Sequence, residues 1–255
     1  MTSLRSKKIP PTVDELADAG VELLEVGKLR RAEKVFRRLL EADPGCVVAH
    51  FNLVRVYWRT KQYALGLLHG RRVLRLSPNE PNACRNLGLI YEKSGNDLQA
   101  LKYYKHELSR DPYETAALWN IGRLYFRKRR WREAAKHLRR CFETGDEFEV
   151  EDTVDKLAIC LHRLRDVRAY IEVFTSYVRI YPSSGWGYAN LGWALMHTKD
   201  YKGAILRFSR ASQLGWKEKV ATDMKQARKL LQSESGGMGG ATSGTVKDDT
   251  GTTEL

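Results

Sequence analysis

The amino-acid sequence predicts an all-α protein made of stacked pairs of antiparallel helices, and two kinds of repeat support this prediction. Proline recurs at steps of 34 residues and then after a further 70 residues, at Pro44, Pro78, Pro112 and Pro182. The triplet Asn-x-Gly keeps the same steps, at 86–88, 120–122 and 190–192. Because unrelated residue types share one period, the chain is predicted to be an array of one repeated structural unit.

Six units of this repeat follow one another along the chain. They cover 13–46, 47–80, 81–114, 115–148, 151–184 and 185–218, and two extra residues interrupt the period after the fourth unit. Residues 1–12 form a basic N-terminal extension. A capping helix is predicted at 219–232, where Val220, Met224 and Ala227 form an apolar stripe that covers the last hydrophobic edge. Residues 233–255 are rich in Gly, Ser and Thr and are predicted to be disordered.

Each unit carries two apolar stripes when its positions are numbered 1 to 34. Positions 4, 7, 8 and 11 are apolar or small, and so are positions 20, 24 and 27, and both spacings place these residues on one face of a helix. Gly88 and Gly122 at position 8 and Ala32 at position 20 are predicted to let the two helices approach closely. Between the stripes, Gly27 and Gly95 suit a tight turn. Each unit is therefore predicted to be a helix pair that has to stack on its neighbours.

Two units depart from this pattern. The second unit has Gly66 and Gly70 at positions 20 and 24, so its second helix is predicted to be thinly packed. The fifth unit has Tyr170 at position 20, where the other units carry a small residue. The helix pair at 151–184 is therefore expected to differ locally from its neighbours.

The repeat resembles the tetratricopeptide repeat (TPR) over residues 13–218. The shared signature is Leu-Gly at positions 7–8, Tyr at 11, Ala at 20, an aromatic residue at 24 and Pro at 32, as in Leu87, Gly88, Tyr91, Ala32, Phe36 and Pro112. The resemblance implies a right-handed α-solenoid of about six helix pairs. It also implies a non-catalytic adaptor or scaffold that holds an extended or helical segment of another protein in a concave groove.

The rest of the composition argues against catalysis. The chain has 255 residues and a formal net charge of +13. It has no Cys-x-x-Cys pair, no His-Glu-x-x-His motif and no nucleotide-binding loop, so we expect no enzymatic activity, no cofactor and no metal. Cys84, Cys141 and Cys160 are interpreted as small buried residues. No apolar run approaches the roughly 18 residues of a transmembrane helix and no signal peptide is evident, so we expect a cytoplasmic protein.

Groove residues follow from the resemblance, because in TPR proteins positions 2, 5, 9, 12 and 13 of the first helix line the groove and position 6 lies at its edge. The residues at these positions that we predict to bind a ligand are Phe51, Asn52, Arg55, Trp58, Arg59, Arg85, Asn86, Trp119, Asn120, Arg123, Phe126, Arg127 and Asn190. Their arginines predict an acidic or carboxylate-bearing protein partner, since a guanidinium holds a carboxylate by two hydrogen bonds. The asparagines are each expected to pair with a peptide amide of that partner.

Two alternatives use other surfaces. A second basic series recurs at positions 25 and 26, as Arg37-Arg38, Arg71-Arg72, Lys105-His106 and Arg139-Arg140. On the outer face of the second helices this series is expected to be solvated, but it would also suit RNA or an anionic membrane surface. Self-association is the other alternative, in which the acidic ends of the first and fifth units pair with a basic unit of a second copy.

Overall fold

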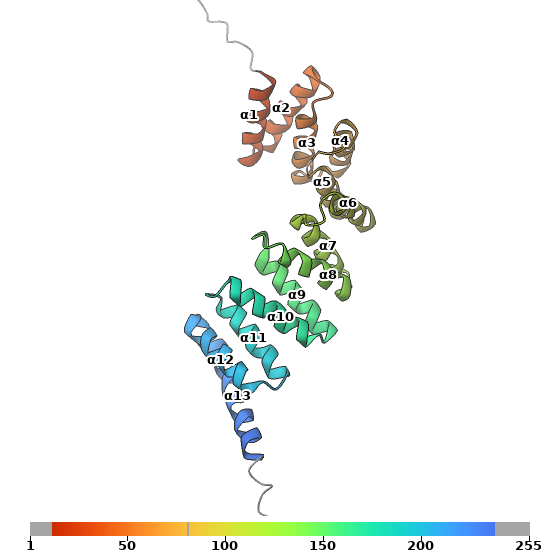
Figure 1. The fold of residues 1–255 in the computed structure, drawn as a ribbon. Coiled ribbons are helices and arrows are strands. Elements are labelled where there is room, and N and C mark those ends of the chain that lie inside the picture. The colour runs from red at the N-terminus through yellow and green to blue at the C-terminus, as the bar shows by residue number, and fades with distance from the viewer. Residues whose placement is uncertain (1–11, 81, 238–255) are drawn as a thin grey trace, which may run out of the picture. The chain divides into compact units, whose positions relative to one another are not determined.

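The computed structural model describes residues 12–80 and 82–237, and within these ranges every regular element is a helix (Figure 1). The all-α prediction is thereby confirmed. The expected N-terminal extension lies outside the described residues except for Thr12, as do residues 238–255 of the expected tail. The chain divides into two compact units at residues 157 and 158, and each is described separately below.

The first unit contains four complete helix pairs. They are α1 (Val13–Glu25) with α2 (Leu29–Ala42), α3 (Val47–Arg59) with α4 (Tyr63–Leu76), α5 (Ala83–Lys93) with α6 (Asp97–Arg110), and α7 (Thr115–Arg127) with α8 (Trp131–Glu143). A further helix, α9 (Val150–Leu164), begins in this unit and crosses the division. Each helix from α1 to α7 packs against the next, and in addition α1 packs against α3 and α3 against α5. These contacts are those of stacked helix pairs.

Glycine at position 8 allows the close approach within a pair that the sequence predicts. A Cβ atom added to Gly122 in α7 would lie 2.7 Å from Cγ of Leu138 in α8, and one added to Gly20 in α1 would lie 2.6 Å from Cε1 of Phe36 in α2. Such distances are too short for two carbon atoms, so any larger residue would force the helices apart.

The second pair is packed differently from the prediction. Gly66 and Gly70 do not leave α4 thinly packed, because side chains of the next helix fill the space beside them. A Cβ atom on Gly66 would lie 2.6 Å from Cδ1 of Ile90, and one on Gly70 would lie 2.6 Å from Cδ2 of Leu87. Both Ile90 and Leu87 are fully buried. Side chains of α5 therefore pack directly against the two glycines of α4.

The turn inside each pair has one geometry throughout. Position 15 adopts a positive φ in all six turns, at Gly27, Lys61, Gly95, Arg129, Arg165 and Lys199. After α1, the N–H of Gly27 donates to the carbonyl of Leu24 at 3.2 Å, and the N–H of Lys28 donates to that of Leu23 at 2.8 Å. This is the Schellman pattern, which satisfies the last carbonyls of a helix. Glycine adopts this conformation without a steric cost at two of the turns, whereas the lysine and arginine residues at the other four adopt it at a cost.

The second compact unit holds α10 (Val167–Ile180), α11 (Gly185–His197), α12 (Tyr201–Ala211) and α13 (Lys217–Gly237). Between α12 and α13 lies the kinked segment η1 (Ser212–Trp216), in which Leu214 and Gly215 depart from helical backbone angles. Val220 of α13 is fully buried against Phe208 and Ala204 of α12. The indole of Trp193 donates to Asp223 at 2.8 Å and fixes α13 further. The predicted capping helix is therefore present but longer than expected: it continues to Gly237, so residues 233–237 of the expected disordered tail are helical.

Candidate binding groove

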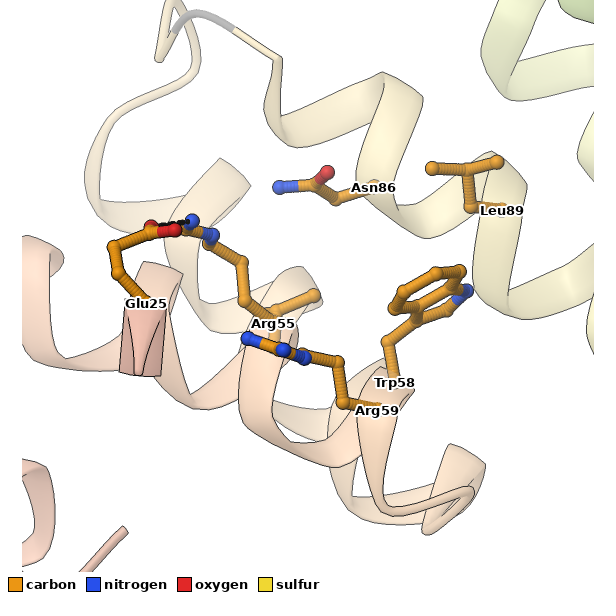
Figure 2. A pocket seen from close by; sticks show the side chains of 7 residues that line it. Glu25, Arg55, Trp58, Arg59, Asn86 and Leu89 are labelled. Atoms are coloured by element: carbon orange, nitrogen blue, oxygen red, sulfur yellow. Dashed lines mark hydrogen bonds and ion pairs between the residues drawn. The ribbon is translucent and has the colours of Figure 1, made fainter. Parts of the chain in front are cut away.

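A cavity of about 460 Å³ lies on the face of the first unit where α1, α3 and α5 meet (Figure 2). We call it the α3 pocket, and it is lined by Glu25, Val54, Arg55, Trp58, Arg59, Asn86 and Leu89. Four of these residues belong to the predicted groove. Glu25, Val54 and Leu89 were not among the predicted ligand-binding residues, although their positions 13, 8 and 9 fall on or beside the predicted groove face.

Two arginines of α3 reach the C-terminal end of α1. The guanidinium of Arg55 forms an ion pair with the Glu25 carboxylate at 2.6 Å, and Arg59 donates to the carbonyl oxygen of Leu24 at 2.5 Å. Cations are favourable at this end of a helix, where the unpaired carbonyl groups leave a partial negative charge. The two arginines therefore place a concentrated positive charge at one side of the α3 pocket.

The opposite side of the α3 pocket is apolar. The Trp58 side chain is 38% exposed and points toward Leu89 of α5, while Arg55 and Arg59 point the other way (Figure 2). Val54 also lines the pocket and is buried. An exposed indole is a large apolar surface that a ligand can cover. The pocket therefore offers a cationic side and an apolar side within one cavity.

The asparagines at position 6 fall into two groups. Asn52, Asn120 and Asn190 are buried, and each side-chain amide donates to the carbonyl four residues earlier, at 3.0, 2.8 and 3.0 Å. Their side-chain oxygens accept hydrogen bonds as well, from Arg55, Arg123 and Tyr170 respectively. The amide nitrogen and the carbonyl oxygen of each of these three side chains thus already have a partner within the chain, and pairing of the three with a ligand stays a prediction.

Asn86 is the exception. Its helix begins only at Ala83, and the residue four positions earlier, Asn82, lies in the left-handed region with φ of 63°. Among residues 12–80 and 82–237, no group forms a hydrogen bond with the Asn86 side chain, and its amide points into the α3 pocket toward Arg55 (Figure 2). An amide has two donors and a carbonyl acceptor, so Asn86 retains its full capacity for pairing.

The corresponding face of α7 has its polar groups paired with acidic residues. Glu92, whose side chain is only 2% exposed, forms ion pairs with Arg123 at 2.8 Å and with Arg127 at 3.0 Å. Tyr104 donates its hydroxyl to the same carboxylate at 3.2 Å. Burial raises the pKa of Tyr104, and the Glu92 charge raises it further, so this hydroxyl stays protonated. We call Glu92, Tyr104, Arg123 and Arg127 the Glu92 network.

The remaining predicted residues on α7 are also engaged. The Trp119 indole donates to Asp152 at 3.1 Å and packs edge-on against Phe148, and the Arg123 guanidinium lies 4.8 Å above its ring. Phe126 packs edge-on against Trp131. The α7 residues therefore do not line the α3 pocket, and they make contacts within the chain; their role in binding stays a prediction.

Phe51 and Arg85 complete the predicted set. Both are half-buried, and neither lines the α3 pocket. Arg85 forms no ion pair within the part of the chain that the structure describes. It is thus the one groove arginine there whose charge has no acidic or carbonyl partner.

A histidine pair lies behind the pocket and holds α3 to α4. Nδ1 of His50 lies 2.7 Å from Nδ1 of His69, and Nε2 of His50 lies 3.1 Å from the carbonyl oxygen of Pro44. The carbonyl oxygen accepts from the Nε2–H group of His50. Burial, followed by the charges of His50 and Arg37, lowers the pKa of His69 to about 4. The His69 ring is therefore neutral near pH 7.

The outer basic series is also partly engaged. Arg37 donates to the hydroxyl of Tyr57 at 3.2 Å, and Arg71 donates to that of Tyr91 at 2.6 Å. Arg140 donates to the carbonyl of Pro112 at 2.7 Å. These side chains link α2, α4 and α8 to a neighbouring helix or loop, which reduces their availability to phosphate groups.

The described residues offer little reactive chemistry. Burial raises the pKa of the Cys84 and Cys141 thiols to about 11 and that of Cys160 to about 12, so none of these buried cysteines is a thiolate near neutrality. In residues 12–80 and 82–237 no three His, Cys, Asp or Glu side chains are grouped so that they could hold a metal ion. Nor is any helix in these ranges long and apolar enough to cross a bilayer.

Solved structures share this fold. A chain of the APC/C hetero-tetramer Cut9-Hcn1 superposes with a TM-score of 0.55 and 18% identity, over 86% of this chain and 43% of that one. A tetratricopeptide repeat protein from Parabacteroides merdae gives 0.54 and 16%, over 89% and 87% of the two chains. MamA protein gives 0.52 and 19%, over 69% and 94%. This chain therefore spans less than half of the Cut9-Hcn1 chain, and no curated protein matches it.

Family models identify the repeats directly. Three models described as tetratricopeptide repeat match residues 18–81, 83–113 and 116–144. These ranges contain α3 and α5, the helices that supply most of the α3 pocket. Proteins of this kind are in general non-catalytic scaffolds for interaction with other proteins. The chain belongs to the tetratricopeptide repeat family.

Proposed function

We propose that the chain is an adaptor that binds an acidic segment of a partner protein in the α3 pocket. The observation that carries this proposal is the combination of an arginine pair, an exposed indole and an unpaired asparagine amide in one cavity.

Each part of the pocket has a complementary part in the ligand. Arg55 holds a carboxylate through the two parallel N–H groups of its guanidinium, which is a strong and directional pairing. Asn86 donates to and accepts from one peptide group of an extended segment. Trp58 and Leu89 cover an apolar side chain beside that peptide group. The preferred ligand is therefore a segment in which acidic and apolar residues alternate.

The test is fluorescence anisotropy with two matched labelled peptides, one of alternating glutamate and leucine and one of alternating lysine and leucine. The full chain is expected to bind the glutamate peptide, and to bind the lysine peptide at least tenfold more weakly, because like charges repel. Truncation of an anchor of the Arg or Trp type commonly weakens binding by about 2 kcal/mol, or roughly thirtyfold. Arg55→Ala and Trp58→Ala should each produce a loss of that order.

Matched variants outside the pocket serve as controls. Arg38→Ala on the outer face of α2 removes the same charge and should leave the affinity for the glutamate peptide within about twofold, since exposed charges at a distance are screened by salt. Equal affinity for both peptides, or unchanged binding after Arg55→Ala, would contradict the proposal. RNA binding that persists at physiological salt and is lost when Arg38 and Arg72 are replaced would favour the outer basic series instead.

A further inference from the structure

The ion pair in the α3 pocket has an unusual construction. Glu25 is the last residue of α1, and an acidic side chain is unfavourable at this end of a helix because the terminal carbonyl groups already carry partial negative charge. Nevertheless the Glu25 carboxylate lies 2.6 Å from Arg55. The side chains of Glu25 and Arg55 are 60% and 35% exposed. A pair this accessible to water is weak and exchanges readily.

We propose that the Glu25 carboxylate is an internal stand-in for the ligand's carboxylate, and that it regulates the affinity of the α3 pocket by occupying Arg55. This inference rests on the proposed function. Both carboxylates use the same guanidinium, so Glu25 competes with an acidic ligand for Arg55. The apparent affinity is then reduced by the fraction of molecules in which Arg55 is free.

Glu92 shows what a structural pair looks like in the same chain. Its side chain is 2% exposed and it receives Arg123, Arg127 and Tyr104 together, so this carboxylate cannot leave its partners without opening the helix packing. Glu25, in contrast, has one cationic partner and lies on the wall of a cavity. The exposed pair is therefore the exchangeable one. Glu25 also makes the α3 pocket selective, because a segment without a carboxylate cannot replace the ion pair that Arg55 forms with Glu25.

The test compares Glu25→Gln with Glu22→Gln, using the labelled glutamate–leucine peptide and the full chain. Glu22 is an exposed acid on the same helix that lies outside the pocket, so both variants change the net charge equally. Glu25→Gln is expected to tighten peptide binding about fivefold, the gain from removing an exposed ion pair that competes with the ligand. Glu22→Gln is expected to stay within about twofold of the wild type.

A double variant locates the effect. In the Arg55→Gln background, Glu25→Gln should give no gain, because the group for which the two carboxylates compete is gone. Circular dichroism should show the same melting temperature for Glu25→Gln and Glu22→Gln, since Glu25→Gln loses a weak pair but relieves the charge at the helix end.

The two proposals fail in different ways. If the wild type binds the glutamate peptide through Arg55 but Glu25→Gln and Glu22→Gln bind it equally, the role of Glu25 is overturned and the proposed function stands. If peptide binding does not depend on Arg55 in any of these backgrounds, or is absent from all of them, the proposed function fails and the role of Glu25 fails with it.

Discussion

The groove faces of α3 and α7 carry nearly the same residue types at the same positions of the repeat, but their arginines have different partners. Arg55 and Arg123 both occupy position 9, and Arg59 and Arg127 both occupy position 13. On α7 these arginines pair with Glu92, which is buried. On α3 the corresponding arginines contact the exposed end of α1, and a cavity lies beside them.

The difference originates in the helix pair that precedes each face. Before α7, the first helix of that pair (α5) supplies Glu92 at position 12 and the second helix (α6) supplies Tyr104, which donates to the carboxylate that pairs with the arginines. Before α3, the first helix of the pair (α1) supplies Glu25 at position 13, one repeat position further on and at the helix end, where it remains exposed. A shift of one position along the repeat thus separates a structural ion pair from an exchangeable one.

The largest expected difference is in stability. Arg123→Ala should lower the free energy of unfolding by about 3 kcal/mol, because it leaves part of the buried Glu92 charge without a partner. Arg55→Ala should lower it by less than about 1 kcal/mol, because the Arg55–Glu25 pair is exposed. Urea unfolding followed by circular dichroism measures both. Equal losses would show that the two faces do not differ as described.

The next difference concerns glycines beside the two faces. Gly122→Ala should destabilise the protein by about 2 kcal/mol, since its Cβ would meet Cγ of Leu138 at 2.7 Å and the backbone nitrogen of Leu138 at 3.3 Å. Gly66→Ala should be close to neutral. Its Cβ would meet only the end of the Ile90 side chain, which can rotate away, and alanine favours the helix by about 1 kcal/mol. Thermal unfolding of the two variants checks this order.

The turns after the two helices should respond alike. Lys61 follows α3 and Arg129 follows α7, and their φ angles are 61° and 57°. A residue with a Cβ atom lowers the stability of the folded chain by about 1–2 kcal/mol when its φ is positive. Replacement by glycine removes this cost, but part of the gain is offset because glycine also has more conformational freedom in the unfolded chain. Lys61→Gly and Arg129→Gly should therefore each raise stability by about 1 kcal/mol. Destabilisation by either variant would show that its side chain has a structural role.

The smallest difference is a change in the slope of stability with pH. His69 has a folded pKa of about 4, below its unfolded value, so its contribution is complete above about pH 6.5 and is lost as the pH falls toward 4. Burial raises the pKa of Asp97, but hydrogen bonds and charges from Lys128 and Arg127 lower it more, and the net shift is downward. The contribution of Asp97 is therefore complete above about pH 4 and is lost below it.

Two variants separate these windows. His69→Gln should flatten the dependence of unfolding free energy on pH between about 6.5 and 4, while Asp97→Asn should flatten it below about 4. His137, whose pKa is also lowered to about 4 by burial, remains in both variants and cancels from the comparison. Guanidinium unfolding at several pH values measures the slopes. A steeper slope in either variant would contradict the assigned direction.

The fold was predictable from the sequence because the residues that recur with the repeat period each determine the structure of their own helix pair. Glycine at position 8, proline at position 32 and the turn at position 15 each determine one feature of a helix pair, and the structure repeats these features. The close packing beside Gly66 and Gly70 was not predicted, because the side chains that fill this space, Ile90 and Leu87, come from the next helix pair.

The site was predictable only in part, because position in the repeat gives the face of a helix but not the partner of each polar group. Arg55, Trp58, Arg59 and Asn86 do meet in one cavity. The engagement of Arg123 depends on Glu92, 31 residues earlier, and such an acid at position 12 facing an arginine at position 9 of the next unit is a signal that a sequence can show. The buried asparagines could also have been suspected, since this residue readily bonds to its own backbone.

Nuclear magnetic resonance of the tryptophan indole N–H groups tests the central claim most directly. Trp58 lines the α3 pocket, whereas the Trp119 indole is hydrogen-bonded to Asp152 beside the Glu92 network. When the glutamate–leucine peptide is titrated into the full chain, the Trp58 signal should move progressively to saturation and the Trp119 signal should stay in place. Movement of Trp119 with an unchanged Trp58 signal would place the ligand on α7 and contradict the assignment of the α3 pocket as the binding site.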